Sequence, residues 1–385
     1  MPTKAEAIVD FCRELVRLPS LPGREGKVAE AVQARMRALN YDSVTVDEWG
    51  NVVGTIVGGR AKVDSPRILL DAHMDTVPPG SLGDWNYDPF GAEIEQGRLY
   101  GRGAVDDKSS LAAIVLMAAL LNRDCLAGTV YVCASVCEEV AEGAALEKVV
   151  EAVRPDFVVV CEPTDLKLGI GQKGRASVLV EATGVASHSA HPSYGVNAVY
   201  KMLPAMERLQ SVETQVDPLL GEEIFELVEL ISTPYPSNAI VPYHCRARYD
   251  CRLVRQEPSS NLLARLQAAA GEEVSASIRS QTITCYTGAQ IEIEEYYPPW
   301  ITAAEVPFVL AARRGVQSTG QSGEGFCASF CTNASYTAGV AHIPTIIYGP
   351  GSVHLAHIPN EYVEVAQIIA ATDGYAAIIS ATLAG

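Results

Sequence analysis

Five short segments, spread over most of the chain, carry histidine and carboxylate side chains of the kinds that bind divalent metals. The segments read LLDAHMDTVPPG, LYGRGAVDDKSSLAA, ASVCEEVAEG, VVVCEPTD and IYGPGSVHLAHIPNEYV. Their candidate metal ligands are His73, Asp106, Glu139, Glu162 and His357. Two imidazoles and three carboxylates suit two divalent cations that share one bridging carboxylate. A free carboxylate beside them, Glu138, could take a proton from water, so the pattern predicts a hydrolytic site.

The spacing of these residues leaves two positions open. GRGAVDDK places Asp106 and Asp107 side by side before a predicted helix, so either could bridge two metals while the other caps the helix. His354 and His357 are both able to bind a metal on chemical grounds.

The HMD sequence suggests how the first histidine is oriented. Alternate residues of an extended chain point the same way, so Asp75 is expected to accept a hydrogen bond from the distal nitrogen of His73. Such a bond fixes the tautomer of a ligand histidine and raises its basicity. Asp75 could instead cap the turn formed by the following TVPPG.

Strands and helices are predicted to alternate around these motifs. Residues 67–70, 129–136, 157–161 and 344–348 are typical of buried strands, and 109–121 and 144–153 of helices. Continuous β-branched runs between helices indicate a doubly wound parallel sheet of the α/β class. Such sheets bind ligands at the carboxyl ends of their strands, where His73, Glu138 and Glu162 would converge. The last helix is expected to begin near Asn360 and Glu361.

The pattern changes near residue 174. Strands with alternating exposure are predicted at 176–182 and 245–254, and helices at 195–209 and 260–270. This order fits an inserted α+β unit of the ferredoxin-like type. We therefore expect residues 1–173 and 292–385 to form a metal-binding catalytic domain, and residues 174–291 to form the insert.

Composition limits the partners and the compartment. The 385 residues include 29 Lys and Arg and 46 Asp and Glu, a formal charge of −17, which disfavours nucleic acid and anionic membranes. The N-terminus has no apolar signal region, and no uninterrupted apolar run reaches the ~18 residues that a membrane span needs. The 10 cysteines form no C-x-x-C pair, and several lie in apolar runs. We therefore expect a cytoplasmic protein with reduced cysteines.

Together, and in this order, the five motifs resemble the di-zinc metallohydrolases that include acetylornithine deacetylase, succinyl-diaminopimelate desuccinylase, aminoacylase and glutamate carboxypeptidase. The resemblance covers nearly the whole chain and implies a zinc-peptidase-like catalytic domain with an inserted dimerisation, or lid, domain. It implies a ligand set for each metal: His73, Asp106 and Glu162 for one, and Asp106, Glu139 and His357 for the other. It also implies that Glu138 is the general base and that the peptide bond between Asp106 and Asp107 is cis.

The same resemblance assigns residues that would contact the substrate or the partner subunit. In GVASHSAHPSYGVNAV, His188, but not His191, matches a histidine that reaches the active site of the partner in a homodimer. Arg252 matches an arginine that binds the substrate carboxylate, although an ion pair with Asp250 would also explain it. The remaining substrate-binding candidates are Gly349, Gly351 and Asn333. The family usually has an asparagine three residues before a proline, whereas Asn238 in SNAIVP lies one residue earlier.

The predicted reaction is therefore hydrolysis of the amide bond of an N-acyl amino acid or a related carboxylate-bearing amide. The cofactors would be two divalent metal ions, zinc first and cobalt or manganese as alternatives. A dipeptidase or carboxypeptidase of the same family is the alternative function, and a catalytically silent binding protein is a third reading. A nucleotide enzyme is disfavoured because the chain has no G-x-x-x-x-G-K-[ST] segment. The YPPW, CTN and EEVAEG segments are most similar to the selenium-metabolism-associated hydrolase branch.

Overall fold

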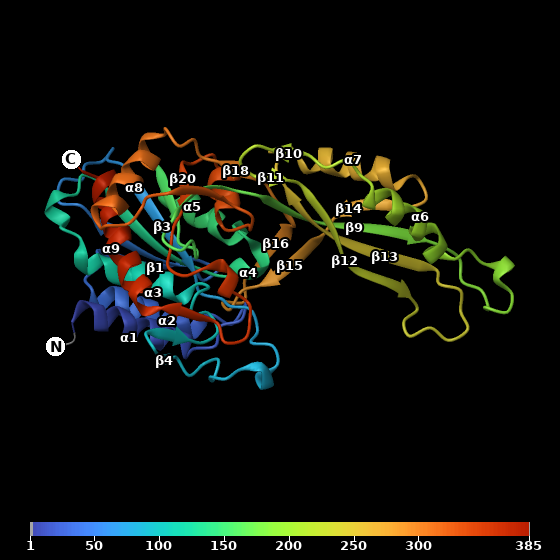
Figure 1. Ribbon diagram of the computed structural model, residues 1–385, viewed down its shortest axis with the longest axis horizontal. Coiled ribbons are helices and arrows are strands. Elements are labelled where there is room, and N and C mark those ends of the chain that lie inside the picture. The colour runs from blue at the N-terminus through green and yellow to red at the C-terminus, as the bar shows by residue number, and fades with distance from the viewer. Residues whose placement is uncertain (1–2, 385) are drawn as a thin grey trace.

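The computed structural model describes residues 3–384, and its larger part is built on one nine-stranded sheet (Figure 1). In sheet order the strands are β1 (Ser43–Val46), β2 (Val52–Val57), β6 (Thr129–Ser135), β3 (Arg67–His73), β7 (Phe157–Val160), β20 (Thr345–Ile347), β8 (Leu168–Gln172) and β18 (Trp300–Ile301), with β19 (Gly325–Ala328) beside β8. The four central strands, β6, β3, β7 and β20, are parallel. The predicted buried parallel strands are therefore present.

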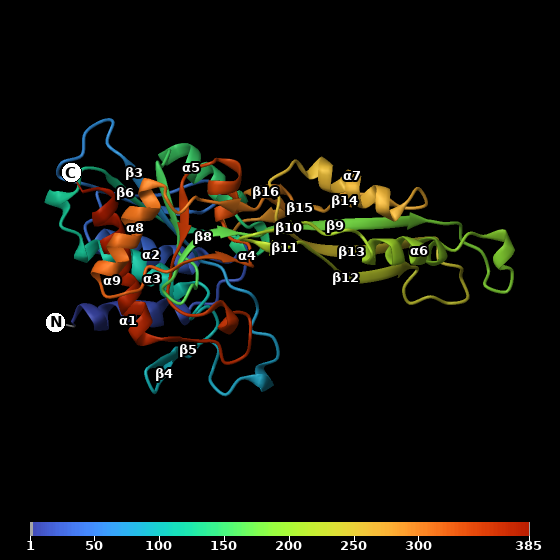
Figure 2. The same cartoon turned by 45° about the horizontal axis from the view of Figure 1, so that its top comes forward.

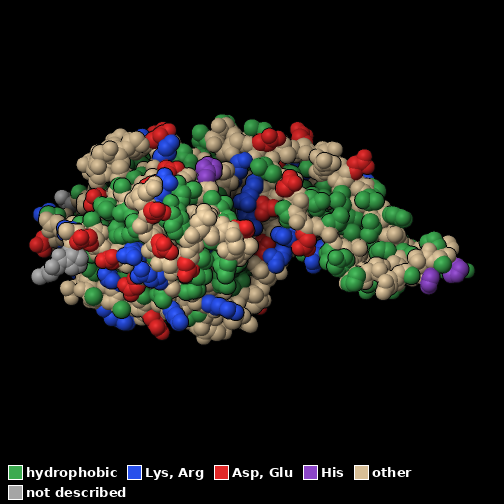
Figure 3. Space-filling view, turned by 60° about the horizontal axis from the view of Figure 1, so that its bottom comes forward, with side chains coloured by type: hydrophobic (Ala, Val, Ile, Leu, Met, Phe, Trp, Pro, Cys, Tyr) green, Lys and Arg blue, Asp and Glu red, His purple; other side chains and the backbone are tan. Residues whose placement is uncertain are grey.

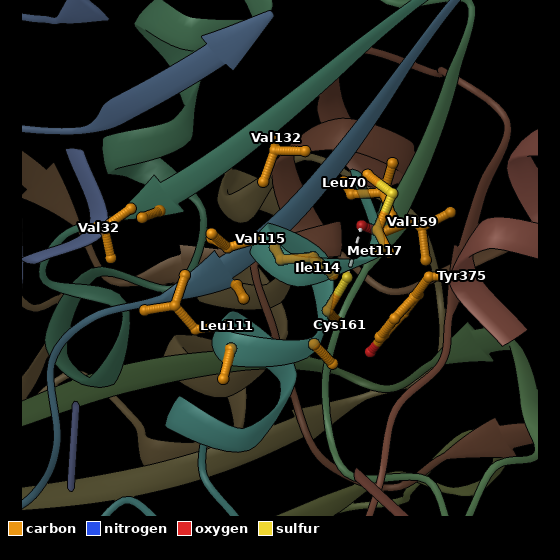
Figure 4. Close-up of a cluster of buried hydrophobic side chains, with 14 of the residues drawn as sticks. Val32, Leu70, Leu111, Ile114, Val115, Met117, Val132, Val159, Cys161 and Tyr375 are labelled. Carbon is orange, nitrogen blue, oxygen red and sulfur yellow. Dashed lines mark hydrogen bonds between the residues drawn. The ribbon is translucent and has the colours of Figure 1, made fainter. Parts of the chain in front are cut away.

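Helices cover both faces of this sheet. On one face lie α1 (Lys4–Val16), α2 (Gly26–Ala38), α3 (Lys108–Leu116), α8 (Pro307–Ser318) and α9 (Val365–Thr382), and on the other lies α5 (Glu147–Val153). Within β3, Ile68 and Leu70 pack into the first layer and Leu69 into the second. Figure 4 shows Leu70, Val132 and Val159 from the sheet packed against side chains of α3 and α9. Burial on both faces explains why apolar residues follow one another directly in these strands, as at Ile68, Leu69 and Leu70 of β3.

Helix α9 is long and apolar enough to cross a membrane, by length and composition alone. In this structure it packs against α8, α3 and α1, and Ile368, Tyr375 and Ile378 are buried in the core. Its apolar composition is therefore that of a core helix.

A second sheet forms an elongated unit beside the first, called the lid domain below (Figures 1 and 2). Its antiparallel strands are β12 (Ile224–Thr233), β13 (His244–Leu253), β9 (Gly174–Thr183) and β14 (Ser275–Ile278), in that order, and β17 (Tyr296–Tyr297) extends it beside β9. Helices α6 (Ala198–Gln210) and α7 (Ser259–Ala270) pack on one face. The β-α-β-β-α-β order confirms the predicted α/β fold with an inserted ferredoxin-like unit.

The chain returns from the lid domain through a hairpin of β15 (Ser280–Thr284) and β16 (Gln290–Glu294). The hairpin packs Ile283 and Ile291 into the core of the sheet domain. The predicted domain boundaries, 1–173 with 292–385 and 174–291, stay a prediction.

One prediction about the C-terminal part is wrong. The last helix does not begin near Asn360, because β21 (Tyr362–Glu364) pairs with β5 (Arg98–Tyr100), which in turn pairs with β4 (Glu93–Glu95). Helix α9 begins only at Val365. An Asn-Glu pair before an apolar run is also typical of a helix start, so the local sequence could not reveal a strand that is paired with distant residues.

Candidate metal centre

The carboxyl ends of the central strands meet at one edge of the sheet and bring the predicted ligands together. His73 is the last residue of β3, Glu138 and Glu139 open the short helix α4 (Glu138–Ala141) after β6, and Glu162 follows β7. Asp106 lies in the turns before α3, and His357 lies in the long connection after β20. The convergence expected from the sheet is therefore observed.

Asp106 lies between the two histidines. Nε2 of His73 is 2.9 Å from Oδ1 of Asp106, and Nε2 of His357 is 3.2 Å from Oδ2 of the same carboxylate. On the outer sides, Nε2 of His73 is 3.9 Å from Oε1 of Glu162, and Nε2 of His357 is 3.1 Å from Oε2 of Glu139. Each oxygen of Asp106 thus faces a different imidazole, which is the arrangement that a bridging ligand requires.

The spacing of these atoms fits metal ions. Ligand atoms of His73, Glu138 and Glu162 lie within 4.8 Å of one another, as do those of His73, Asp106 and Glu139. Two ligands that are each ~2.0–2.2 Å from a tetrahedral metal lie ~3.3 Å from each other. The observed histidine–carboxylate separations of 2.9–3.9 Å fall around this value. The three carboxylates of the donor set also offset most of the charge of two divalent ions.

Asp75 holds the loop that carries the glutamate pair. Its Oδ1 accepts from the N–H of Glu138 at 3.0 Å, and its Oδ2 accepts from the N–H of Glu139 at 3.1 Å. Nδ1 of His73 lies 2.9 Å from the carbonyl oxygen of Asp75 and 3.5 Å from its Oδ1. The expected contact between Asp75 and His73 is therefore closer through the backbone carbonyl than through the carboxylate.

The structure distinguishes Asp106 from Asp107 and His357 from His354, the two choices that spacing alone left open. Asp107 is buried and accepts from the backbone N–H of His73 at 3.3 Å, so it contacts the backbone of the cluster. The peptide bond between Asp106 and Asp107 is cis, as the resemblance implied. His354 is exposed on the turn before His357.

Glu361 is a site residue that the sequence analysis missed. Its buried carboxylate accepts from the backbone N–H groups of Val105 and Asp106 at 2.9 and 3.2 Å. Its other oxygen is 2.5 Å from the guanidinium of Arg102. The local sequence gave no signal for this role, because the contacts join segments 256 residues apart.

Burial and mutual contact perturb the titration of the cluster. Burial raises the pKa of Glu138 and of Glu162 well above the usual range, and neighbouring carboxylates add to the effect. Burial also raises the pKa of Asp106, but hydrogen bonds to His357 and His73 outweigh it and hold that pKa below its usual value. Hydrogen bonds to Asp106 and Glu139 raise the pKa of His357 to about 10.

A cavity of about 440 Å³ opens beside the cluster, where the lid domain meets the sheet domain. Arg252 from β13 and Arg175 from β9 line it together with the metal-ligand candidates. Nε of Arg252 is 2.8 Å from Oδ1 of Asp250, so Arg252 both pairs with Asp250 and faces the cavity. Arg175 connects Asp250 at 3.0 Å to Glu142 at 2.6 Å. Figure 3 shows basic and acidic side chains gathered at this junction.

Three predicted substrate-binding residues already have partners within the chain. The N–H of Gly349 donates to Oγ1 of Thr164 at 3.0 Å, and the N–H of Gly351 donates to Oε1 of Gln367 at 2.5 Å. Asn333 is buried and donates to Oδ2 of Asp71 at 2.7 Å. These contacts give the three residues structural roles, and their contact with substrate stays a prediction.

His188 lies far from the cluster of its own chain. It belongs to the connection between β9 and α6, at the outer end of the lid domain (Figures 1 and 2). Nδ1 of His188 accepts from the N–H of Ala190 at 3.0 Å, so the neutral ring carries its proton on Nε2. His191 and Asn238 are also exposed on loops of the lid domain.

The sequence matches a model of Peptidase family M20/M25/M40 over residues 69–381. The uncharacterized protein YgeY of Escherichia coli is 30% identical over 96% of this chain and 92% of its own length. A succinyl-diaminopimelate desuccinylase of Cereibacter sphaeroides is 29% identical over 94% of both. Solved structures share the fold. The aminopeptidase PepT of Bacillus cereus has a TM-score of 0.75 at 19% identity, over 98% of both chains. The YxeP protein of Bacillus subtilis, described as a dinuclear metal binding peptidase, has a TM-score of 0.69 at 15% identity, over 99% of this chain and 98% of its own.

The chain belongs to the M20/M25/M40 peptidase family, because the family model covers most of its length. This confirms the family resemblance drawn from the five motifs. The protein is therefore a metallohydrolase that acts on amide bonds. The narrower placement in the selenium-metabolism-associated branch stays a prediction.

The perturbed groups predict how pH changes the stability of the metal-free protein. A raised carboxyl pKa, as in Glu138 and Glu162, stabilises the fold below the unfolded pKa of ~4.5, and this contribution is lost as pH rises through the folded pKa. His357 acts in the same direction between ~6.5 and about 10. The melting temperature in excess chelator should therefore fall from pH ~5 to ~9. A Glu138→Gln/Glu162→Gln variant should show a smaller fall, and an unchanged slope would contradict this reading.

Proposed function

We propose that this enzyme hydrolyses the amide bond of an N-acyl amino acid, or of a related amide that bears a free carboxylate, with two divalent metal ions. One ion would be held by His73, Asp106 and Glu162, and the other by Asp106, Glu139 and His357. The observation that supports this proposal is that the two oxygens of Asp106 face different imidazoles, at 2.9 and 3.2 Å. The mixed imidazole and carboxylate donors suit zinc first, and also cobalt or manganese.

Glu138 is the proposed general base. Bound divalent metals would polarise the scissile carbonyl and lower the pKa of water to ~7. Glu138 lies at the cluster but outside both proposed ligand sets, and Asp75 fixes its backbone. Its carboxylate would take a proton from water and hold it, which the raised pKa of this buried group favours. The same carboxyl group would then return the proton to the leaving amine.

Arg252 is the proposed partner of the substrate carboxylate. It lines the cavity with Glu138 and the ligand residues, so an amide at the metals and a carboxylate at its guanidinium would share one space. Planar guanidinium groups bind carboxylates through paired hydrogen bonds. The desuccinylase and aminopeptidase names among the similar proteins leave deacylase and dipeptidase or carboxypeptidase as related alternatives.

We further propose a homodimer formed through the lid domain. The outer strand β12 exposes Ile224, Val228 and Leu230, and α6 exposes Tyr200 and Leu203. Unpaired, apolar edge strands are rarely left exposed to solvent. A second copy on this face would allow His188 of one protomer to reach the cavity of the other. Its Nε2–H could then donate to the developing oxyanion.

The proposed compartment is the cytoplasm. All 10 cysteines are free thiols, and most of them are buried. Free thiols are typical of reducing compartments. We propose a small-molecule amide or a short peptide as the substrate, and the charge of −17 disfavours nucleic acid and anionic membranes as partners. We also propose that residues 1–173 and 292–385 form the catalytic domain and 174–291 the insert.

A substrate panel tests the proposed function. Purified enzyme loaded with zinc, cobalt or manganese should hydrolyse at least one member of a set of N-acetyl amino acids, N-succinyl amino acids and dipeptides, as measured by amine release. Amidation of the substrate carboxylate should raise KM, and Arg252→Met should remove that preference. Glu138→Gln should lower kcat by ~10²–10⁴ while two metals remain bound, because it removes only the base. Hydrolysis that survives complete metal removal would contradict the proposal.

Hybrid dimers test the role of His188. His188→Ala should lower kcat by ~10²–10³, and Glu138→Ala should also be nearly inactive. Random mixing of these two variants makes heterodimers with one intact site, so activity should recover to about a quarter of wild type. His191→Ala is the matched control on the same loop and should retain activity. If heterodimers form without recovery, His188 does not act across the interface.

A further inference from the structure

The sheet fixes only part of the proposed metal centre. His73 ends β3, and Glu162 comes two residues after β7, so strand pairing sets their positions. Asp106 and His357 instead lie in irregular segments, and His357 has a left-handed backbone with φ of 64°. Nε2 of His357 lies 3.2 Å from Oδ2 of Asp106. Because the sheet does not fix these two residues, a separate interaction must set the distance between them.

Glu361 is in a position to provide that interaction. It lies four residues after His357, and its side chain is 0% exposed. Oε1 accepts from the N–H groups of Val105 and Asp106 at 2.9 and 3.2 Å. Its carbonyl oxygen also accepts from the N–H of Gly101 at 2.9 Å. Both the backbone and the side chain of Glu361 thus bind the loop that carries Asp106.

Arg102 orients the Glu361 carboxylate. Its NH1 is 2.5 Å from Oε2 of Glu361, and its side chain is 2% exposed. A charge-assisted hydrogen bond of this kind is stronger and shorter than a neutral one. Without a cation, another buried carboxylate beside an acidic cluster would cost substantial free energy. The pair therefore presents Oε1 to the two amides in one fixed direction.

The segment around Glu361 is held on both sides. Oδ1 of Asn360 accepts from the N–H of Asn86 at 2.6 Å, and Tyr362 pairs with Tyr100 in the β21–β5 ladder. Glu361 therefore belongs to a rigid segment, and a change in its side chain would shift the Asp106 loop relative to His357.

We infer that Glu361 is a positioning residue that sets the separation of Asp106 and His357, and with it the affinity of the metal site formed by Asp106, Glu139 and His357. This inference rests on the proposed two-metal centre. Glu361 would contact neither metal nor substrate, and it would act by joining the Asp106 loop to the segment that carries His357. Residues that orient metal ligands in this way typically contribute 10–100-fold to metal affinity.

The test compares Glu361→Gln with Glu364→Gln. Glu364 is on the same segment and pairs with Arg98 at 2.8 Å, but it is partly exposed and belongs to β21. Zinc binding would be measured by equilibrium dialysis and metal analysis of each variant, with His357→Ala as the reference for loss of this site. Glu361→Gln should bind one zinc ion with wild-type affinity and the second ~10–100-fold more weakly. His357→Ala should weaken binding of the same second ion, and by a larger factor. Glu364→Gln should bind two ions like wild type.

Two further measurements separate positioning from a general structural role. The melting temperature in excess chelator reports the stability of the metal-free fold. If Glu361 is a positioning residue, adding zinc should raise the melting temperature of Glu361→Gln by less than it raises that of wild type. The cobalt-substituted variant should show an altered visible spectrum at one of the two sites. Should Glu361→Gln fail to fold, Glu361→Asp keeps the charge but shortens the reach, and the same loss of the second ion is expected.

The inference is overturned if Glu361→Gln, or Glu361→Asp in its place, binds both zinc ions with wild-type affinity. It is equally overturned if the affinities for both zinc ions fall by the same factor, since that indicates general destabilisation of the protein. Failure of the two-metal proposal itself would appear differently, as a wild-type protein that does not bind two ions.

Discussion

The structure depends on concentrating carboxylates and imidazoles at one buried edge of a sheet. Asp106, Glu138, Glu139 and Glu162 converge there with His73 and His357. Burial, with a further contribution from neighbouring carboxylates, raises the pKa values of Glu138 and Glu162, so ionising the whole cluster costs free energy unless cations are present. The parallel strands supply the convergence, because their carboxyl ends must lie along the same edge. The acidity of the site and its proposed affinity for metals therefore have the same origin.

A second layer of carboxylates holds this cluster by its backbone. Asp75 accepts from the amides of Glu138 and Glu139, Asp107 from that of His73, and Glu361 from those of Val105 and Asp106. Each bond joins two segments that are distant in sequence. Because hydrogen bonds to backbone amides favour the charged form of a carboxylate, these contacts fix the loops and also offset some of the cost of burial. The geometry of the site therefore depends on contacts between loops as much as on the sheet.

The parts of the site that sequence analysis predicted are those with a local signal. His73 and Glu162 follow buried β-branched runs, and Glu138 with Glu139 follows another, so strand prediction alone placed them at one edge. Asp106 and His357 lie in irregular loops, and the family resemblance was needed to choose them. The sequence predicts a helix start at Glu361, because the local sequence does not reveal that the residues after it form β21 and pair with residues 98–100. The intrachain partners of Gly349, Gly351 and Asn333, which are Thr164, Gln367 and Asp71, lie far away in the sequence and could not be predicted from neighbouring residues.

The order of strands in the main sheet also constrains how the protein is synthesised. Strand β20, which is residues 345–347, lies between β7 and β8, which end before residue 173. While the ribosome is still translating the lid domain, the apolar edge of β7 has no neighbour from its own chain. Exposed strand edges of this kind readily pair with other polypeptides. The nascent enzyme is thus most vulnerable to aggregation during the interval before residues 345–347 of its 385 have emerged.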